Sequence, residues 1–228
     1  MRVLVIENFP GAPAGVFGAW LEQARGATLR VVSPDTLPDS HGDEDLIVTL
    51  GSPSGAWEDL PWIHRQRRFL QGAIAAGRPV VGICFGAQLI ATAIGGRAAP
   101  MGDRVFVGWH ANEEVADPVW RGPWVRWHAD HLEVPEGTEV LARDRGTVQV
   151  FRHGSAVGVQ FHPEASDEMA NFWAEKTPDM MARAGATPEA VARDGAACFP
   201  QGAAARHALF TEMLRRAGVP ATKEGVLP

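Results

Sequence analysis

Several features are scarce in this chain of 228 residues, and each scarcity excludes a class of protein. The two cysteines, Cys84 and Cys198, are too few for the disulfide framework of a small secreted domain, so we expect a reducing compartment. Lysine occurs only at Lys176 and Lys223. The net charge is −6 and the sequence has no basic stripe, which argues against nucleic acid as a partner.

Targeting, membrane and nucleotide-binding signals are also missing. The first residues lead directly into an apolar strand at residues 2–6, with no charged and apolar leader, and no apolar run has the length of a membrane span. We therefore expect no membrane contact and a cytoplasmic location. Neither a GxxxxGK[ST] loop nor a Ser-Gly-Gly-x-Asp-Ser loop occurs, so an ATP-using site on this chain is not expected, nor is any cofactor.

The most informative segment is an apolar strand that leads into a Gly-x-Cys-x-Gly turn and then into a helix. Gly82 and Gly86 leave room for the chain to bend around Cys84 and for a substrate to approach. The helix that begins near Gly86 points its amino end at Cys84, which favours the thiolate over the thiol. This is the pattern of a nucleophile elbow. Taken alone, Cys84 also fits a small buried core residue.

A second segment supports a reactive cysteine. His162 has the side chain that a cysteine hydrolase needs as its general base. Glu164 follows across Pro163, which fixes the local turn and lets both side chains lie on one side of a strand end. The carboxylate can then orient the imidazole and stabilise its charged form. Cys84, His162 and Glu164 therefore predict a catalytic triad.

Strand-like and helix-like segments alternate through the first part of the chain. This alternation predicts an α/β fold with a doubly wound, mostly parallel sheet flanked by helices. Ligands in such sheets bind at the carboxyl ends of the strands, where Gly51 and Cys84 fall. The expected strands are residues 2–7, 29–32, 46–50 and 80–83, and the expected helices are about residues 14–24, 62–76 and 87–94.

The pattern changes after Gly96. Short runs at residues 138–142, 147–152 and 156–161 predict antiparallel hairpins that return His162 to Cys84. We expect a single domain over residues 1–228, with this small antiparallel extension and a helical C-terminal segment from about residue 166.

Several separated motifs occur in an order that points to one family. They are Gly51-Ser52-Pro53-Ser54-Gly55, Pro61-Trp62-Ile63, Gly82-Ile83-Cys84-Phe85-Gly86-Ala87-Gln88, Gly95-Gly96, Gly108-Trp109, Trp127-His128-Ala129-Asp130 and Val159-Gln160-Phe161-His162-Pro163-Glu164. Over about residues 1–185 the chain resembles the class I glutamine amidotransferases of the triad type, and especially single-domain members related to the glutaminase domain of GMP synthetase. The resemblance implies their flavodoxin-like fold.

The resemblance also implies roles for residues around the triad. The backbone N–H groups of Ser52 and Phe85 would form the oxyanion hole. Most relatives have glycine where this chain has Ser52, but the donor belongs to the backbone, so the serine side chain does not remove it. Gln88 would hold the amino-acid end of the substrate. Three further residues complete the implied substrate pocket, namely Gly51, Gly108 and Trp109.

Two aromatic and histidine-rich features leave alternatives open. His128, Asp130 and His131 lie close together and His110 could join them, but cysteines and further carboxylates at ligand spacing are missing, so we expect no metal. The resemblance instead places His128 and Asp130 beside the mouth of the site, without an assigned role. The tryptophans from Trp109 to Trp127 either pack in the core or line an acceptor or partner surface.

The implied reaction is attack of the Cys84 thiolate on a γ-glutamyl amide and hydrolysis of the resulting thioester to glutamate. The leading interpretation is glutamine as substrate, with the ammonia passed to an acceptor on a separate synthetase subunit. The alternative is a stand-alone γ-glutamyl hydrolase or peptidase that acts on glutathione-like compounds. An inactive binding or regulatory module is a third hypothesis, against which the intact triad argues.

Overall fold

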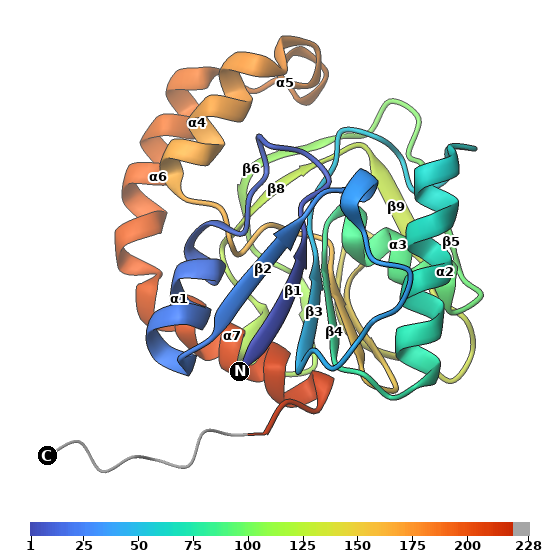
Figure 1. Cartoon of the computed structure of the whole chain (residues 1–228). Helices are drawn as coiled ribbons and strands as arrows, with labels where there is room; N and C mark the ends of the chain where they lie inside the picture. The colour runs from blue at the N-terminus through green and yellow to red at the C-terminus, as the bar shows by residue number, and fades with distance from the viewer. Residues whose placement is uncertain (221–228) are drawn as a thin grey trace, which may run out of the picture.

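An eight-stranded sheet runs through the centre of the molecule, with helices on both faces (Figure 1). The computed structural model describes residues 1–220. The first five strands in spatial order pair in parallel, and the remaining pairings are antiparallel. This confirms the predicted fold class. From edge to edge the strands are β2 (Thr28–Val32), β1 (Arg2–Ile6), β3 (Leu46–Thr49), β4 (Val80–Ile83), β12 (Ala156–Val159), β11 (Thr147–His153), β10 (Glu139–Asp144) and β7 (Glu114–Val115).

The two faces of the sheet are covered by different helices because successive strand side chains point to opposite sides. Val3 and Val5 belong to the core shared with α1 (Gly15–Arg25) and α7 (Ala203–Ala217). Leu4 and Ile6 belong to the core shared with α2 (Pro61–Ala75) and α3 (Phe85–Ala93). Both faces are therefore buried, which explains why these strands read as continuous apolar runs.

Two short antiparallel sheets cover the region between residues 97 and 133, which the sequence pattern left unassigned. They are β5 (Arg97–Pro100) with β9 (Asp130–Glu133), and β6 (Phe106–His110) with β8 (Trp124–His128). A single bridge joins β8 to the segment after β12, through Val125 and His162. In this way β8 is held against the carboxyl end of the central sheet.

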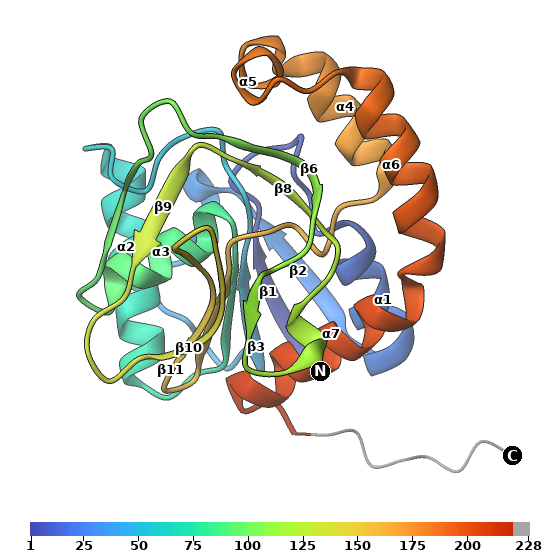
Figure 2. The ribbon, with the colours of Figure 1, turned by 180° about the vertical axis from the view of Figure 1, so that it is seen from behind.

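Helices follow residue 166, as expected. Figures 1 and 2 both show the first three of them together at one side of the molecule, beside β6 and β8. Ser166 caps the first of these helices by accepting a hydrogen bond from the backbone N–H of Met169. The three helices are α4 (Asp167–Lys176), α5 (Pro178–Ala184) and α6 (Pro188–Gln201), and α7 then returns along the sheet.

The tryptophans of the unassigned region are mainly packing residues. Trp120, Trp124 and Trp127 are buried, and Trp124 stacks on Phe161 with ring centroids 5.7 Å apart. Trp120 and Trp124 therefore follow the core-packing alternative, whereas Trp127 is buried and also borders a cavity.

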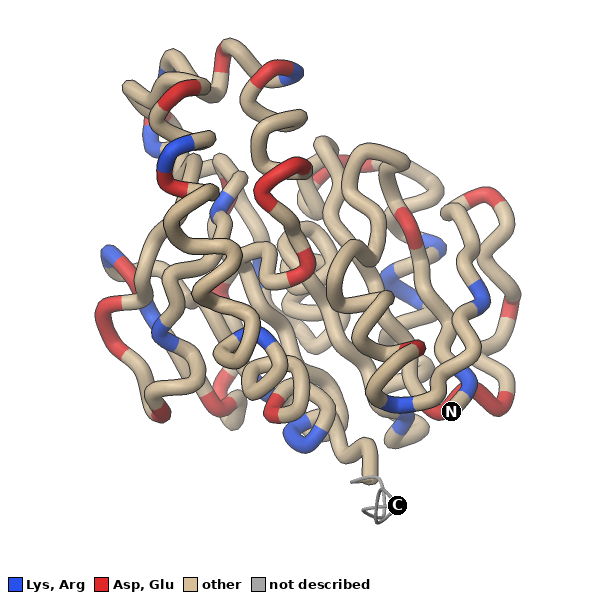
Figure 3. The backbone as a smooth tube through the Cα atoms, turned by 90° about the vertical axis from the view of Figure 1, so that its left-hand side faces the viewer, with Lys and Arg blue, Asp and Glu red and all other residues tan. Residues whose placement is uncertain are grey.

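On the face shown in Figure 3, lysine and arginine are interspersed with aspartate and glutamate. Within the described part of the chain, no helix combines the length and the apolarity needed to cross a membrane. The expected single domain extended to residue 228, and residues 221–228 lie outside the described part, so the domain boundary stays a prediction.

Candidate active site

Cys84 lies at the junction of β4 and α3 in a strained backbone conformation. Its φ of 53° and ψ of −109° fall in a region that residues other than glycine rarely adopt. A methyl group on Gly86 would clash with the backbone carbonyl of Thr49, and one on Gly82 would lie 2.6 Å from the backbone of Gly86. The two glycines therefore let the start of α3 pack directly on β3 and β4, which forces the sharp turn at Cys84.

His162 and Glu164 form a buried pair beside this turn. The Nδ1 atom of His162 lies 2.7 Å from Oε1 of Glu164, and their side chains are 4% and 0% exposed. The backbone N–H of His162 donates to the carbonyl of Val125 at 2.7 Å, and the carbonyl of Glu164 accepts from Val16 at 3.0 Å. Because both ends of the His-Pro-Glu segment are fixed through the backbone, the two side chains are held in position.

The His162 ring also packs against two neighbouring residues. It packs against the indole of Trp173, with ring centroids 4.7 Å apart. On another side it lies over Gly51, where an added methyl group would come within 3.1 Å of the imidazole Cε1. Trp173 is held in turn by a 2.7 Å hydrogen bond from its indole N–H to the carbonyl of Gly11.

The electrostatics favour a charged His162. Burial lowers the pKa of this imidazole, but the neighbouring Glu164 and Cys84 outweigh burial and raise the pKa of His162 to about 10. Cys84 and His162 line the same cavity, and the Cys84 sulfur lies 4.0 Å from the carbonyl oxygen of Trp127. The arrangement therefore favours a charged imidazolium ring beside Cys84.

Two candidate oxyanion donors lie next to Cys84. Phe85 is the first residue of α3, so its N–H has no acceptor within the helix. Ser52 follows β3, and its side chain has a separate task, because Oγ accepts a 3.1 Å hydrogen bond from the N–H of Ser54. The serine side chain therefore supports the turn and leaves its own backbone N–H for other partners.

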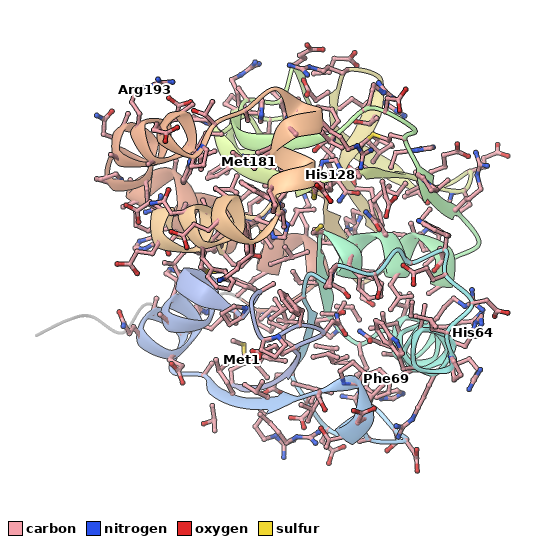
Figure 4. The ribbon with its side chains drawn as sticks, turned by 90° about the horizontal axis from the view of Figure 1, so that it is seen from above. Met1, His64, Phe69, His128, Met181 and Arg193 are labelled. Carbon is pink, nitrogen blue, oxygen red and sulfur yellow. The ribbon has the colours of Figure 1, made fainter. Side chains whose placement is uncertain are left out.

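A cavity of about 290 Å³ opens beside Cys84. Its walls come from the loop after β3, the start of α3, the end of β8, the His162 segment and the α4–α5 region. Figure 4 looks onto this end of the molecule, with His128 near the centre and Met181 of α5 beside it. The predicted residues brought together around the cavity are Gly51, Ser52, Cys84, Phe85, Gln88, His128, Asp130 and His162.

Gly108 and Trp109 are the predicted pocket residues that the structure does not bring to the cavity. Both lie on β6, where Gly108 pairs with Arg126 of β8. Trp109 packs instead against Phe199 of α6, with ring centroids 6.4 Å apart. Since β8 lies between β6 and Cys84, the cavity wall at this position is formed by Trp127 and His128.

His110 makes a hydrogen bond within its own strand segment. Its Nε2 atom lies 2.7 Å from the carbonyl of Val107. Over residues 1–220, no three histidine, cysteine, aspartate or glutamate side chains gather closely enough to hold a metal ion.

Several cavity residues were not predicted from the sequence. Trp57 and Glu58 follow the Gly51–Gly55 motif within a few residues, so their proximity in the chain was a usable signal. Trp173 and Thr177 reach the cavity from the α4–α5 region, for which nothing local in the sequence indicated a role.

Comparisons with known proteins identify the family of this chain. The family model described as glutamine amidotransferase class-I matches residues 22–171. A GMP synthase of Pyrobaculum aerophilum is 29% identical over 182 residues, which are 72% of this chain and 33% of that protein. A γ-glutamyl-L-1-hydroxyisopropylamide hydrolase of a Pseudomonas species is 29% identical over 171 residues, which are 61% of this chain and 54% of that protein.

A solved structure shares the fold over the whole length. A glutamine amidotransferase of Methylobacillus flagellatus superimposes with a TM-score of 0.84 at 22% identity, covering 100% of this chain and 98% of that one. The two sequence relatives are longer, since this chain spans only a third to about half of them. The match to the family model covers most of the chain, and on that basis the protein belongs to the class I glutamine amidotransferases.

Proposed function

We propose that this protein hydrolyses a γ-glutamyl amide through a thioester on Cys84, with glutamine as the substrate and glutamate and ammonia as the products. The observation that carries the proposal is the buried His162, which lies 2.7 Å from the Glu164 carboxylate and lines the same cavity as Cys84. A cysteine nucleophile, a base and an orienting carboxylate are the parts that acyl transfer needs.

In the first half of the reaction the thiolate of Cys84 attacks the carbonyl carbon of the amide. The negative charge that develops on the carbonyl oxygen is stabilised by the backbone N–H groups of Ser52 and Phe85. His162 gives its proton to the leaving nitrogen as the C–N bond breaks, so ammonia departs and a glutamyl thioester remains.

In the second half a water molecule takes the place of ammonia. Neutral His162 removes a proton from this water, and the resulting hydroxide attacks the thioester. The C–S bond breaks, glutamate leaves and Cys84 returns to the thiolate. Glu164 does not react in either half; its carboxylate keeps the imidazole oriented and stabilises the imidazolium.

The fate of the ammonia is part of the proposal. We place its acceptor on a separate synthetase subunit, because the sequence contains no phosphate-binding loop of the kinds that ATP-using synthetases carry. The similarity to a glutamine-hydrolysing GMP synthase supports glutamine as the ammonia source.

A stand-alone γ-glutamyl hydrolase is the second candidate, and the aromatic wall beside His162 favours it. Phe9 and Trp173 both line the cavity, and they are connected through Gly11, which packs on the Phe9 ring and accepts the Trp173 hydrogen bond. A leaving nitrogen must face His162, so an organic group on that nitrogen would lie against these rings. Ammonia is too small and too polar a leaving group to gain from contact with these two rings.

The test is release of glutamate from purified protein offered glutamine, glutathione and other γ-glutamyl amides, with Cys84→Ala as the blank. Turnover of glutamine alone, or turnover that requires cell extract, supports an ammonia donor that works with a synthetase. Rapid cleavage of glutathione or a bulky amide without glutaminase activity supports the hydrolase. Activity retained in Cys84→Ala, or no glutamate from any substrate with or without extract, contradicts the mechanism.

A further inference from the structure

A second cavity, of about 400 Å³, lies between α1 and α7, the two helices in the lower part of Figure 1. It shares no lining residue with the cavity beside Cys84. Small-molecule sites in proteins have volumes of roughly 300–1,000 Å³, so this cavity is large enough for a ligand. Apart from valine and alanine, the residues that line it are Trp20, Gln23, Arg206, His207 and Phe210.

Two aromatic rings supply the apolar part of the cavity wall. The ring centroids of Trp20 and Phe210 are 5.4 Å apart, and the two residues are 8% and 1% exposed. Because both rings are already packed in the protein, they present a fixed apolar surface to the cavity. An apolar group that lies against this surface loses contact with water, which favours binding.

Arg206 is buried but uses few of the hydrogen-bond donors of its side chain. It is 8% exposed, and its Nη1 atom donates to the carbonyl of Phe199 at 2.7 Å. The guanidinium also lies over the Phe199 ring, 4.0 Å from the centroid. A guanidinium has five N–H donors. Among residues 1–220 the carbonyl of Phe199 is the acceptor that it uses, so four donors are left for another partner.

The charge of Arg206 is not paired with a carboxylate in the described part of the chain. Burial lowers the pKa of Arg206, and the charge of Asp167 opposes this effect without forming an ion pair. No aspartate or glutamate lines the cavity. Arginine stays charged in proteins, and a buried charge without a counter-ion costs free energy. An anion bound in the cavity would therefore be stabilised by Arg206.

We propose that this cavity binds a small organic acid. The carboxylate of the ligand pairs with the remaining N–H groups of Arg206, and its apolar body lies against Trp20 and Phe210. Gln23 and His207 line the same cavity and offer further side-chain N–H donors. A carboxylate suits the cavity better than a phosphate group, because one arginine and no lysine line it. The site goes beyond the proposed function and does not depend on it.

Three ligands of similar shape test the charge requirement. 3-Phenylpropionate is the acid, 3-phenylpropanamide is its neutral counterpart, and 3-phenylpropylamine carries the opposite charge. Each is titrated into the whole chain while nuclear magnetic resonance follows the indole N–H signal of Trp20, assigned with Trp20→Phe. We expect the acid to shift this signal with a Kd of about 0.1–1 mM, which is ordinary for so small a ligand. The amide should bind at least about tenfold more weakly, and the amine should give no shift.

Variants assign the effect to Arg206. Arg206→Gln removes the charge and should raise the Kd of the acid about tenfold or more, while the Kd of the amide changes less than about threefold. Arg206→Lys keeps the charge without the two parallel donors and should give an intermediate Kd, which tests the pairing even if the glutamine variant does not fold. Arg215→Gln is the matched control, because it removes the same charge from α7 at a side chain that is 63% exposed and outside the cavity. It should leave both Kd values unchanged.

Three results would overturn the proposal. An unchanged Trp20 signal, with or without shifts at Trp57 and Trp173 of the active-site cavity, would show that the acid does not bind between α1 and α7. Equal affinities for the acid and the amide would remove the carboxylate requirement. Equal losses in Arg206→Gln and Arg215→Gln would mean that only the overall charge matters. Each of these is a binding measurement, so its outcome is distinct from success or failure of the proposed hydrolysis.

Discussion

Arg126 of β8 and Asp144 of β10 form an ion pair inside the protein, with side chains 0% and 4% exposed. The second guanidinium nitrogen donates to the carbonyl of Ala111 at 3.1 Å and to Oδ1 of Asn112 at 2.7 Å. Arg126 immediately precedes Trp127 and His128, which form part of the cavity wall. The pair therefore anchors the wall to the sheet.

Removing one partner of this pair should be strongly destabilising. We expect Asp144→Asn to lower the free energy of unfolding by about 3–5 kcal/mol, because it leaves the Arg126 charge buried without compensation. Denaturant unfolding followed by tryptophan fluorescence measures this loss. The double variant Arg126→Met/Asp144→Leu removes both charges and should recover much of the stability; a double variant less stable than Asp144→Asn would contradict this account.

Gly51 is needed because the His162 ring lies over its α-carbon. Gly51→Ala would place a methyl group 3.1 Å from Cε1 of the imidazole, so the ring must shift. We expect kcat/KM to fall about 10- to 100-fold, since small misplacements of a catalytic group are costly. Gly72→Ala in α2 is the control, because nothing lies within 4 Å of the added methyl group. It should keep full activity and gain about 0.5–1 kcal/mol in stability. An unimpaired Gly51→Ala enzyme would show that the ring tolerates the shift.

The charge of His162 predicts a particular pH dependence. Its pKa is raised from 6.5 to about 10 in the folded protein, so this interaction stabilises the fold fully below pH 6.5 and is lost as the pH rises through about 10. In Glu164→Gln the carboxylate that raises this pKa is gone while burial remains, so the pKa of His162 should fall.

Nuclear magnetic resonance of the His162 Cε1–H signal measures this shift directly. The wild-type ring should stay protonated through pH 8, and the Glu164→Gln ring should lose its proton at lower pH. The turnover of Glu164→Gln should fall, but less than the roughly 10²- to 10⁴-fold expected for His162→Ala, because Glu164 orients and does not react. Identical titration and pH–rate profiles in both proteins would refute the triad assignment.

The backbone at Cys84 carries strain that glycine would relieve. At a φ of 53° and ψ of −109°, any side chain is unfavourable, at a cost of about 1–3 kcal/mol. Cys84→Gly and Cys84→Ala both lack the sulfur, so neither should turn over substrate. We expect the glycine variant to be about 1 kcal/mol more stable than the alanine variant, even after the greater flexibility of its unfolded chain is counted. Thermal or denaturant unfolding of the pair checks this, and a more stable alanine variant would mean that the turn relaxes.

The sequence allowed the parallel sheet and the proximity of Cys84, His162 and Glu164 to be predicted because both depend on local patterns. The strands near residues 2–6, 46–49 and 80–83 are apolar runs between helical segments, and the structure has them within a residue or two of the expected positions. The buried pair His162–Glu164 follows from three consecutive residues. Its position next to Cys84 follows from the parallel pairing of β12 with β4.

Other parts of the site depend on contacts that no local pattern encodes. β8 forms the cavity wall because it pairs with β6 and bridges to His162, and its mixed aromatic, aliphatic and polar residues are buried along the whole strand. Trp173 reaches His162 only because α4 folds back over the carboxyl end of the sheet. For the same reason Gly108 and Trp109, which the motif comparison placed in the pocket, lie one strand away from it.

The bridge between Val125 and His162 couples the position of the cavity wall to the position of the His162 backbone. The carbonyl of Val125 holds the backbone of His162 at 2.7 Å, and two residues later Trp127 presents its own carbonyl to the Cys84 sulfur. If β8 shifts along its length, the His162 ring and the part of the cavity wall formed by Trp127 and His128 therefore move together. The β6–β8 pair therefore links the outer edge of the molecule to the backbone that carries His162.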